Sequence, residues 1–147
     1  MRITQEADYA LRIVCCLAEQ EGLIDANTIA EQCCVSQQFA LKILRKLMLE
    51  ALVKSHKGAN GGYRLMLPPE EITMRRVIEL IDGEIFVSRC LSVDHACSKQ
   101  GEHKRDCVIH CIFDAVNRDI VAKLDKVRIS SLIDGDLSAE DIIKIFD

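Results

Sequence analysis

The stretch from residue 28 to residue 67 constrains the fold most, because its apolar residues change from a helical spacing to an alternating one. Two short helices are predicted first, separated by a break at Val35 and Ser36, and two short strands follow across a glycine-rich turn. The four segments are expected at 28–32, 37–50, 52–56 and 63–67. Two short helices followed by a β-hairpin predict a winged helix-turn-helix.

Helical patterns flank this unit on both sides. Further helices are predicted at 4–21, about 73–81, about 107–130 and from about 138 onward. Glu6 and Asp8 suit the positive end of the first of these helices. The longest one carries an apolar stripe made of Ile109, Ile112, Phe113, Val116, Ile120, Leu124 and Val127. The expected fold is therefore mainly α, with a small β-hairpin wing and one long helix beside the winged domain.

The long helix must bury its stripe against another surface, and pairing with a second copy of the chain is the favoured solution. A two-fold dimer would also match palindromic DNA, whose half-sites lie about one helical turn apart. Packing of the stripe onto the same chain is the alternative. The expected organisation is a winged DNA-binding domain over 1–84, a cysteine-rich segment over 85–106, and a dimerisation helix with a helical tail over 107–147.

Charge is unevenly distributed along the chain. The net charge is −4, which taken alone argues against a nucleic-acid partner. Between residues 36 and 65, however, six Lys or Arg side chains accompany one acid, Glu50, whereas residues 66–147 carry 11 basic and 16 acidic side chains. A segment of net charge +5 on an otherwise acidic protein predicts a DNA-binding face.

Candidate DNA contacts lie on the second helix of the helix-turn-helix and at the wing tip. Amide and guanidinium groups on such a helix read base edges in the major groove, lysines contact phosphates, and the wing can reach the minor groove. The candidates are Ser36, Gln37, Gln38, Lys42, Arg45, Lys46, Lys57, Asn60 and Gly61. For the residues from Ser36 to Lys46, the alternative is an ordinary solvated helix that does not contact DNA. A phosphate-binding loop is the alternative for the wing, but the Gly-Lys-Ser/Thr ending of such loops is missing.

Eight cysteines need an explanation. The chain shows no secretion signal and no membrane-spanning run, so it is expected in the cytoplasm, where disulfides are disfavoured. Thiolate and imidazole groups gather within 22 residues, at Cys90, Cys97, Cys107, His110 and Cys111. These groups bind soft metals and iron–sulfur clusters. Structural zinc sites usually pair two short Cys spacings, and only one occurs here. No Cys-x-x-Cys motif or nucleophile–base pair is recognisable, so an enzyme is not expected.

Four stretches, at residues 1–12, 36–47, 52–55 and 58–65, together form a pattern that can be compared with known families. The last of them, Gly58-Ala59-Asn60-Gly61-Gly62-Tyr63-Arg64-Leu65, is the most specific. Over about residues 1–132 the chain resembles the IscR/NsrR-type (Rrf-two) family of winged-helix transcriptional regulators. The resemblance implies a homodimeric regulator of double-stranded DNA that holds an iron–sulfur cluster, 2Fe-2S or 4Fe-4S, on Cys90, Cys97 and Cys107.

The fourth cluster ligand stays open among three residues. The run from Cys107 to His110 resembles the Cys-x-x-His of cluster-binding members, which implies His110. Asp8 matches the acidic residue that nitric-oxide-sensing members supply from the partner's first helix. Cys111 matches neither pattern, although both His110 and Cys111 would share a helix face with Cys107.

The resulting hypothesis is a regulator whose operator binding changes when its cluster is lost or is damaged by nitric oxide, oxygen or iron shortage. A winged-helix regulator that uses zinc, or redox-switched thiols without a cluster, is the alternative. A protein–protein adaptor built on the winged domain is another, and it would lack the steep salt dependence of DNA binding.

Overall fold

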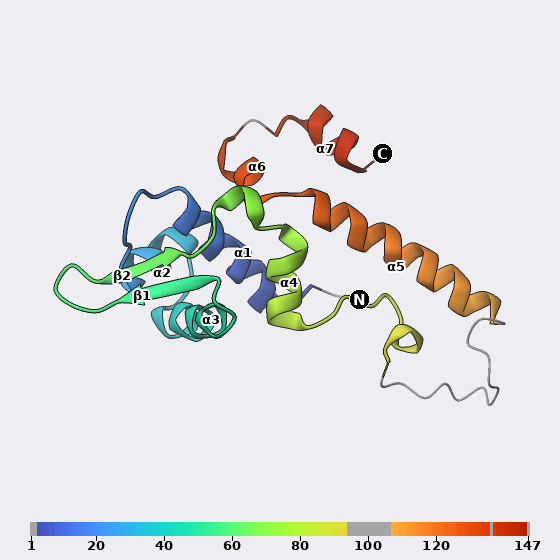
Figure 1. Cartoon of the computed structure of the whole chain (residues 1–147), viewed down its shortest axis with the longest axis horizontal. Helices are drawn as coiled ribbons and strands as arrows, with labels where there is room; N and C mark the ends of the chain where they lie inside the picture. The colour runs from blue at the N-terminus through green and yellow to red at the C-terminus, as the bar shows by residue number, and fades with distance from the viewer. Residues whose placement is uncertain (1–2, 94–106, 136, 147) are drawn as a thin grey trace.

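The computed structural model describes residues 3–93, 107–135 and 137–146. A winged domain forms one end of the molecule, and a long helix projects from it toward the other end (Figure 1). The elements in chain order are α1 (Gln5–Ala18), α2 (Ala26–Cys33), α3 (Gln37–Leu49), β1 (Val53–His56), β2 (Gly62–Leu65), η1 (Pro69–Glu71), α4 (Met74–Asp82), η2 (Arg89–Leu91), α5 (Val108–Lys126), α6 (Ile129–Ile133) and α7 (Ala139–Phe146). The mainly α architecture with a two-stranded wing matches the prediction.

Side-chain caps fix where the helices of the winged domain begin. Thr4 accepts from the Ala7 N–H, Asp25 from two N–H groups of α2, Ser36 from the Phe39 N–H, and Thr73 from the Arg76 N–H. Each cap satisfies a backbone donor that the first helical turn leaves unpaired. Local sequence chemistry therefore sets the start of all four helices.

The first helix ends earlier than the sequence pattern predicts. α1 stops at Ala18 rather than near residue 21, because the chain turns to run beside the wing. Ile24 exchanges two backbone hydrogen bonds with Tyr63, at 3.1 and 2.8 Å. Gly62 permits this approach, since a Cβ at that position would lie 2.6 Å from the Ile24 carbonyl oxygen. A long-range contact that local periodicity does not encode thus shortens the helix.

The hydrophobic core forms around α1, which packs against α2, α3, α4 and α6. Its fully buried side chains include Ala10, Ile13 and Val14. Partners from the other helices include Ile29, Ile43, Leu44, Leu47, Val77 and Ile129. Removal of this apolar surface from water is the main term that stabilises the domain.

The long helix also differs from the prediction at its C-terminal end. α5 ends at Lys126, and Val127 belongs to the core of the winged domain instead of the helix stripe. The chain pairs there with the segment before α4: the Met74 N–H donates to the Val127 carbonyl and the Ile129 N–H to the Ile72 carbonyl, both at 2.9 Å. These backbone bonds replace helical ones, so the predicted helix to residue 130 is divided into α5 and α6. Within the described ranges, no helix is long and apolar enough to cross a bilayer.

Thr73 is a suitable position to test this junction, because it is buried, caps α4, and donates from its hydroxyl to Asp125 Oδ1 at 3.2 Å. We expect Thr73→Val to lower the free energy of unfolding by about 1–2 kcal/mol, since it removes a cap and a hydrogen bond. Urea denaturation followed by circular dichroism measures the change. Thr73→Ser keeps the hydroxyl and should lose much less. Equal losses for both variants would contradict the role of the hydroxyl.

Candidate nucleic-acid interface and cysteine site

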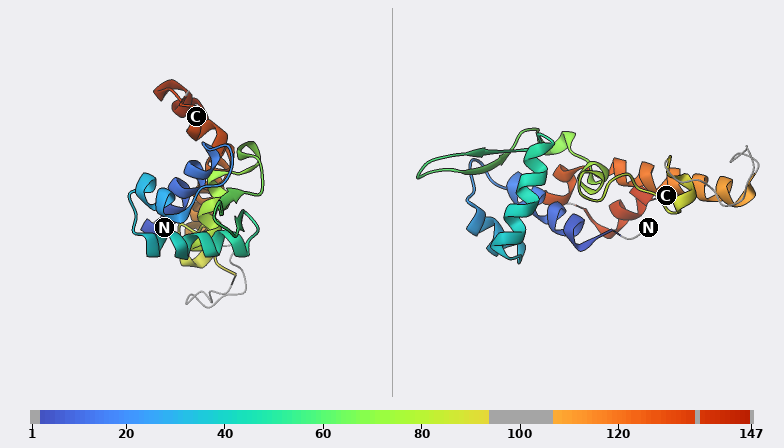
Figure 2. Two further views of the ribbon diagram at one scale, coloured as in Figure 1. Left: turned by 90° about the vertical axis from the view of Figure 1, so that its left-hand side faces the viewer. Right: turned by 90° about the horizontal axis from the view of Figure 1, so that it is seen from below.

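The predicted DNA contacts gather at one end of the molecule, on α3 and on the hairpin beside it (Figure 2). Along α3, the side chains of Gln37, Gln38 and Arg45 are exposed, as is the cap residue Ser36. At the wing tip, Lys57 and Asn60 are exposed and Gly61 is half-buried. A Cβ at Gly61 would lie 2.3 Å from the His56 carbonyl oxygen, so this turn requires glycine there. The face that α3 presents is the polar one, because its apolar face packs on α1.

Two of the predicted DNA contacts, Lys42 and Lys46, are already paired within the chain. The Lys46 ammonium lies 2.6 Å from Glu6 Oε1, and the Lys42 ammonium lies 3.0 Å from Glu6 Oε2. The Lys46 hydrogen bond lowers the pKa of the Glu6 carboxyl, burial partly opposes that effect, and the Lys42 hydrogen bond lowers the pKa further. Glu6 therefore carries its negative charge at neutral pH, next to the basic helix.

Two aromatic rings also join α1 to α3 near these ion pairs. The rings of Tyr9 and Phe39 meet edge to face with centroids 5.6 Å apart, which joins α1 to α3. The Lys42 ammonium lies 5.3 Å from the centre of the Phe39 ring, and the Arg12 guanidinium lies 5.4 Å from that of Tyr9. Sequence reasoning missed the pairing of Glu6 with α3, because 36 residues separate it from Lys42 and no local pattern links them.

The cysteine site starts on the segment that follows α4. Cys90 lies half-buried in η2, and its Sγ is 3.3 Å from the Ser88 hydroxyl oxygen. η2 packs against α5, below its outer half in Figure 1. The Val87 N–H donates to Asn117 Oδ1 at 2.9 Å, so a side chain of α5 fixes the backbone three residues before Cys90.

The other candidate ligands lie at the start of α5. Cys107 occupies the N-cap position and its carbonyl accepts from the Cys111 N–H at 3.0 Å. His110 is half-buried, and its Nδ1 is buried without a hydrogen-bond partner among the described residues. Cys111 is exposed. The remaining predicted ligand, Cys97, lies outside the described residues.

Asp8 lies on α1, where it forms an ion pair with Arg12 at 2.7 Å, and its side chain is about half exposed. Within the described ranges, no three His, Cys, Asp or Glu side chains converge so that they could hold a metal ion. The donor types nevertheless fit an iron–sulfur cluster, because the half-buried Cys90 and Cys107 supply thiols and the unpartnered Nδ1 of His110 is a ready imidazole donor.

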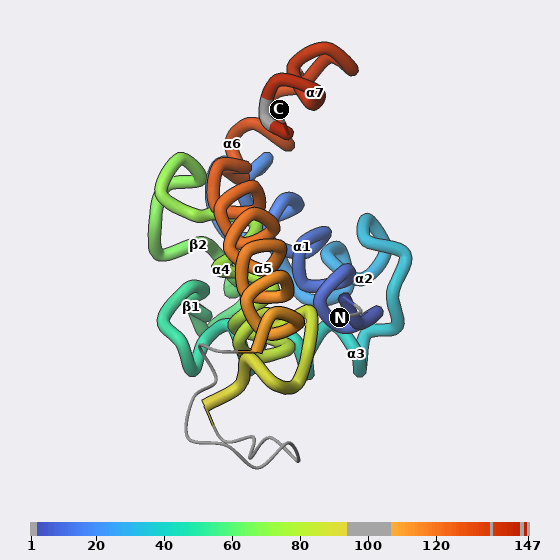
Figure 3. The backbone as a smooth tube through the Cα atoms, turned by 90° about the vertical axis from the view of Figure 1, so that its right-hand side faces the viewer, coloured from blue at the N-terminus to red at the C-terminus, as the bar shows by residue number. Residues whose placement is uncertain are grey.

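The apolar stripe of α5 is packed against the domain along one half of the helix and exposed along the other. Its C-terminal half packs against α4, which lies behind α5 in Figure 3. Ile120 and Leu124, in this half, are half-buried. Its N-terminal half projects beyond the winged domain and exposes Val108, Ile109, Ile112, Phe113 and Val116, with Val108 72% exposed. Packing onto the same chain therefore covers the C-terminal half of the stripe, and the N-terminal half is exposed among the described residues.

Comparison with known proteins relates this arrangement to transcriptional regulators. A family model described as "Rrf2: Iron-dependent Transcriptional regulator" matches residues 3–135. The chain is 31% identical over 137 residues to the HTH-type transcriptional regulator IscR of Aliivibrio salmonicida, a match that covers 92% of this chain and 73% of that protein.

Solved structures share the fold. The structure of CymR, the global cysteine regulator of B. subtilis, matches with a TM-score of 0.69 and 28% identity over 91% of this chain and 97% of that one. The structure of T. potens IscR matches with a TM-score of 0.69 over 94% of this chain and 93% of that one; at 21% identity it supports the fold alone. The winged-helix prediction is thereby confirmed.

Proposed function

The chain belongs to the Rrf2 family of DNA-binding transcriptional regulators, and we propose that it binds operator DNA as a homodimer under the control of an iron–sulfur cluster. As a member of this family it is a regulator and not an enzyme. The observation that carries the cluster proposal is that η2, which holds Cys90, packs against α5, the helix whose start carries Cys107 and the unpartnered His110 Nδ1. It would act in the cytoplasm, where thiol ligands stay reduced.

DNA recognition would use α3 in the major groove and the wing beside it. Arg45, Gln37 and Gln38 supply the donors and acceptors that distinguish base edges, and all three are exposed. Of the basic residues on α3, Arg45 is the one that Glu6 does not pair with in the described residues. We therefore infer that Arg45 contributes most to sequence reading, with Lys57 and Asn60 of the wing contacting the backbone or the minor groove.

Cys90, Cys97, Cys107 and His110 would hold the cluster, with Asp8 of the partner subunit or Cys111 as the other candidates for the fourth position. A bound cluster would supply reactivity toward oxidants and nitric oxide. A cluster whose fourth ligand is an imidazole or a carboxylate would be more reactive than one with four thiolates. The protein's part is to hold two segments together: Asn117 anchors the backbone before Cys90, and the first turn of α5 carries Cys107 and His110. Ligation would therefore fix the segment after α4 against α5.

A short path connects this segment to the DNA-binding face. Asp82, the last residue of α4, accepts from the Thr4 N–H at 2.9 Å and from the Thr4 hydroxyl. Thr4 caps α1, and Glu6 in the same first turn pairs with Lys42 and Lys46 of α3. A shift of the segment after α4 would therefore move the N-terminus of α1 and the helix paired with it. This coupling supports control of DNA binding by the cysteine site.

Dimerisation would bury the exposed half of the α5 stripe. Several large apolar residues on one helix face are unusual at a free surface and typical of an interface. A two-fold pair of α5 helices would set the separation of the two α3 helices, and operator half-sites must match that separation.

The second candidate mechanism keeps the regulator but uses thiol chemistry or zinc in place of a cluster. Redox-switched thiols need no shared metal site, which agrees with the described residues, where no three candidate ligands converge. The chain is also similar to CymR, the global cysteine regulator of B. subtilis. Counting iron, zinc and acid-labile sulfide in anaerobically prepared protein distinguishes the two mechanisms.

Arg45→Ala should weaken operator binding by about 1–3 kcal/mol, because it removes a base-reading guanidinium. Fluorescence anisotropy with an operator selected from a random-sequence pool measures the loss. Lys144→Ala, on the exposed α7, changes the net charge equally and should have little effect. Unchanged binding by Arg45→Ala would show that α3 is not the reading helix.

Cys107→Ala should abolish retention of iron and sulfide after anaerobic reconstitution, since it removes a thiolate from the start of α5. Metal and sulfide analysis with a visible absorption spectrum provides the measurement. Cys34→Ala removes an exposed thiol on the winged domain and should behave like the wild type. If the reconstituted wild-type protein is colourless and lacks iron and sulfide, the cluster proposal fails.

Ile112→Asp should shift the protein from dimer to monomer, because it places a charge in the middle of the exposed α5 stripe. Sedimentation velocity at several protein concentrations measures the shift. Leu49→Asp is the matched control, since Leu49 is 84% exposed on the winged domain and lies outside the stripe. A dimer that persists in Ile112→Asp would place the interface elsewhere.

A further inference from the structure

Glu6 changes the electrostatic character of the reading helix. Three cations, Lys42, Arg45 and Lys46, lie along α3, and a single carboxylate from α1 pairs with two of them. The net charge of residues 36–65 does not include this carboxylate, because Glu6 lies 30 residues before that segment begins. The charge that α3 offers to DNA is therefore smaller than its sequence suggests.

We propose that Glu6 limits sequence-independent DNA binding by holding the Lys42 and Lys46 ammonium groups away from phosphate. This inference rests on the DNA-binding function proposed above and identifies a residue that controls its specificity. Non-specific binding depends almost entirely on lysine and arginine contacts to phosphate, whereas specific binding adds contacts to base edges. A carboxylate that competes for two lysines should therefore weaken the non-specific mode more than the specific one.

The exposure of the three side chains supports competition with DNA. Glu6 is 19% exposed, whereas Lys42 is 55% and Lys46 is 37% exposed, so the carboxylate is recessed and the ammonium groups lie nearer to solvent. A phosphate that approached both lysines would meet the fixed negative charge behind them. Either the ion pairs break, which leaves Glu6 with fewer partners, or the phosphate is repelled. Breaking the pairs costs free energy, and repulsion lowers the number of phosphates that α3 neutralises, so both outcomes weaken binding to phosphate.

A purely structural role for the pairs is the competing explanation. Ion pairs at exposed sites usually contribute little to stability. The contact between α1 and α3 is already made by the core and by the Tyr9–Phe39 ring pair. The salt dependence of DNA affinity separates the two roles, because a structural residue would change stability without changing the number of phosphates neutralised.

The test compares wild type with Glu6→Gln, using the full-length reconstituted protein and a random-sequence duplex that lacks the operator. We expect Glu6→Gln to bind this duplex several-fold more tightly at low salt. The slope of log affinity against log salt should become steeper by about 0.9 to 1.8, which corresponds to one or two additional phosphates. The ratio of operator affinity to random-duplex affinity should fall.

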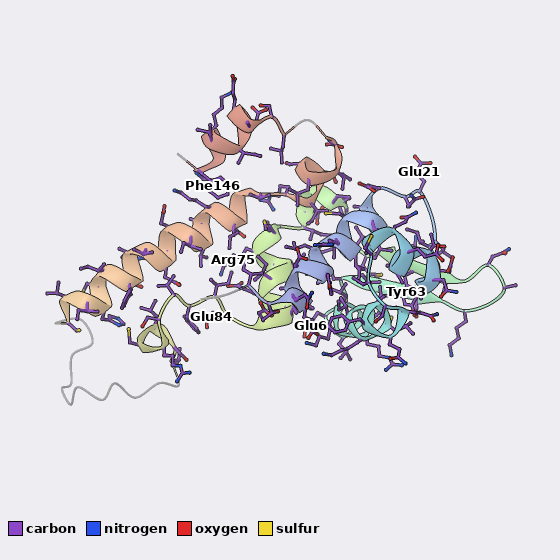
Figure 4. The ribbon with its side chains drawn as sticks, turned by 180° about the vertical axis from the view of Figure 1, so that it is seen from behind. Glu6, Glu21, Tyr63, Arg75, Glu84 and Phe146 are labelled. Atoms are coloured by element: carbon purple, nitrogen blue, oxygen red, sulfur yellow. The ribbon has the colours of Figure 1, made fainter. Side chains whose placement is uncertain are left out.

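The control is Glu21→Gln, which changes the net charge equally. Figure 4 shows Glu21 and Glu6 at separate sites, with Glu21 on the loop that follows α1 and far from the α3 side chains beside Glu6. Its slope should equal that of the wild type. Glu6→Ala, a second neutral variant, should reproduce the steeper slope, and Glu6→Asp, which keeps the charge, should restore a shallower one. Adding Lys46→Met to Glu6→Gln should remove part of the gain.

A Glu6→Gln slope that equals or is shallower than the wild-type slope would overturn the inference, provided that thermal unfolding shows a folded protein. If Glu6→Gln is unfolded, the same criterion applies to Glu6→Ala, the second neutral variant. Failure of the proposed function would look different: wild type and every Glu6 variant would then show no salt-dependent affinity for the random duplex and none for any selected operator.

Discussion

Burial of the α1 apolar face is the constraint on which the other features depend. α1 packs against α2, α3, α4 and α6, and its buried residues form the middle of the core. In that position the first turn of α1 contacts two segments that are distant from it in the sequence. Thr4 contacts Asp82 at the end of α4, and Glu6 contacts Lys42 and Lys46 on α3. One helical turn thus touches both α3 and the start of the segment that carries Cys90.

The sequence predicted the local elements well, because short-range chemistry determines them. Caps such as Ser36 and Thr73, the glycine-rich turn and the 3-4 spacing of apolar residues act over a few positions. The points that it missed depend on distant partners. α1 ends early because Ile24 pairs with Tyr63, and α5 ends early because residues 127–129 pair with 72–74. Helical periodicity carries no information about such backbone pairings.

The candidate sites show the same division. Exposure of Gln37, Gln38 and Arg45 follows from the stripe on α3, so amphipathic spacing was sufficient to predict it. The Glu6 pairs could not be predicted, since Glu6 suits the first turn of any helix through its dipole. For the cysteines, the sequence predicted the ligand types, whereas the unpartnered Nδ1 of His110 and the contact of Asn117 with the Val87 backbone came from the structure. Cys97 lies outside the described residues, so the full ligand set stays a prediction.

The backbone pairing of Ile24 with Tyr63 and the close approach at Gly62 secure the hairpin at its base. The tip from 57 to 61 lies beyond that attachment and is largely exposed. The wing is therefore attached to the domain at its base, and its exposed tip lies outside the core. Changes in the length or charge of the tip would alter how far the wing extends and which DNA groove it prefers, without disturbing core packing. Related chains could therefore differ in their DNA targets at this short turn while they keep the same fold.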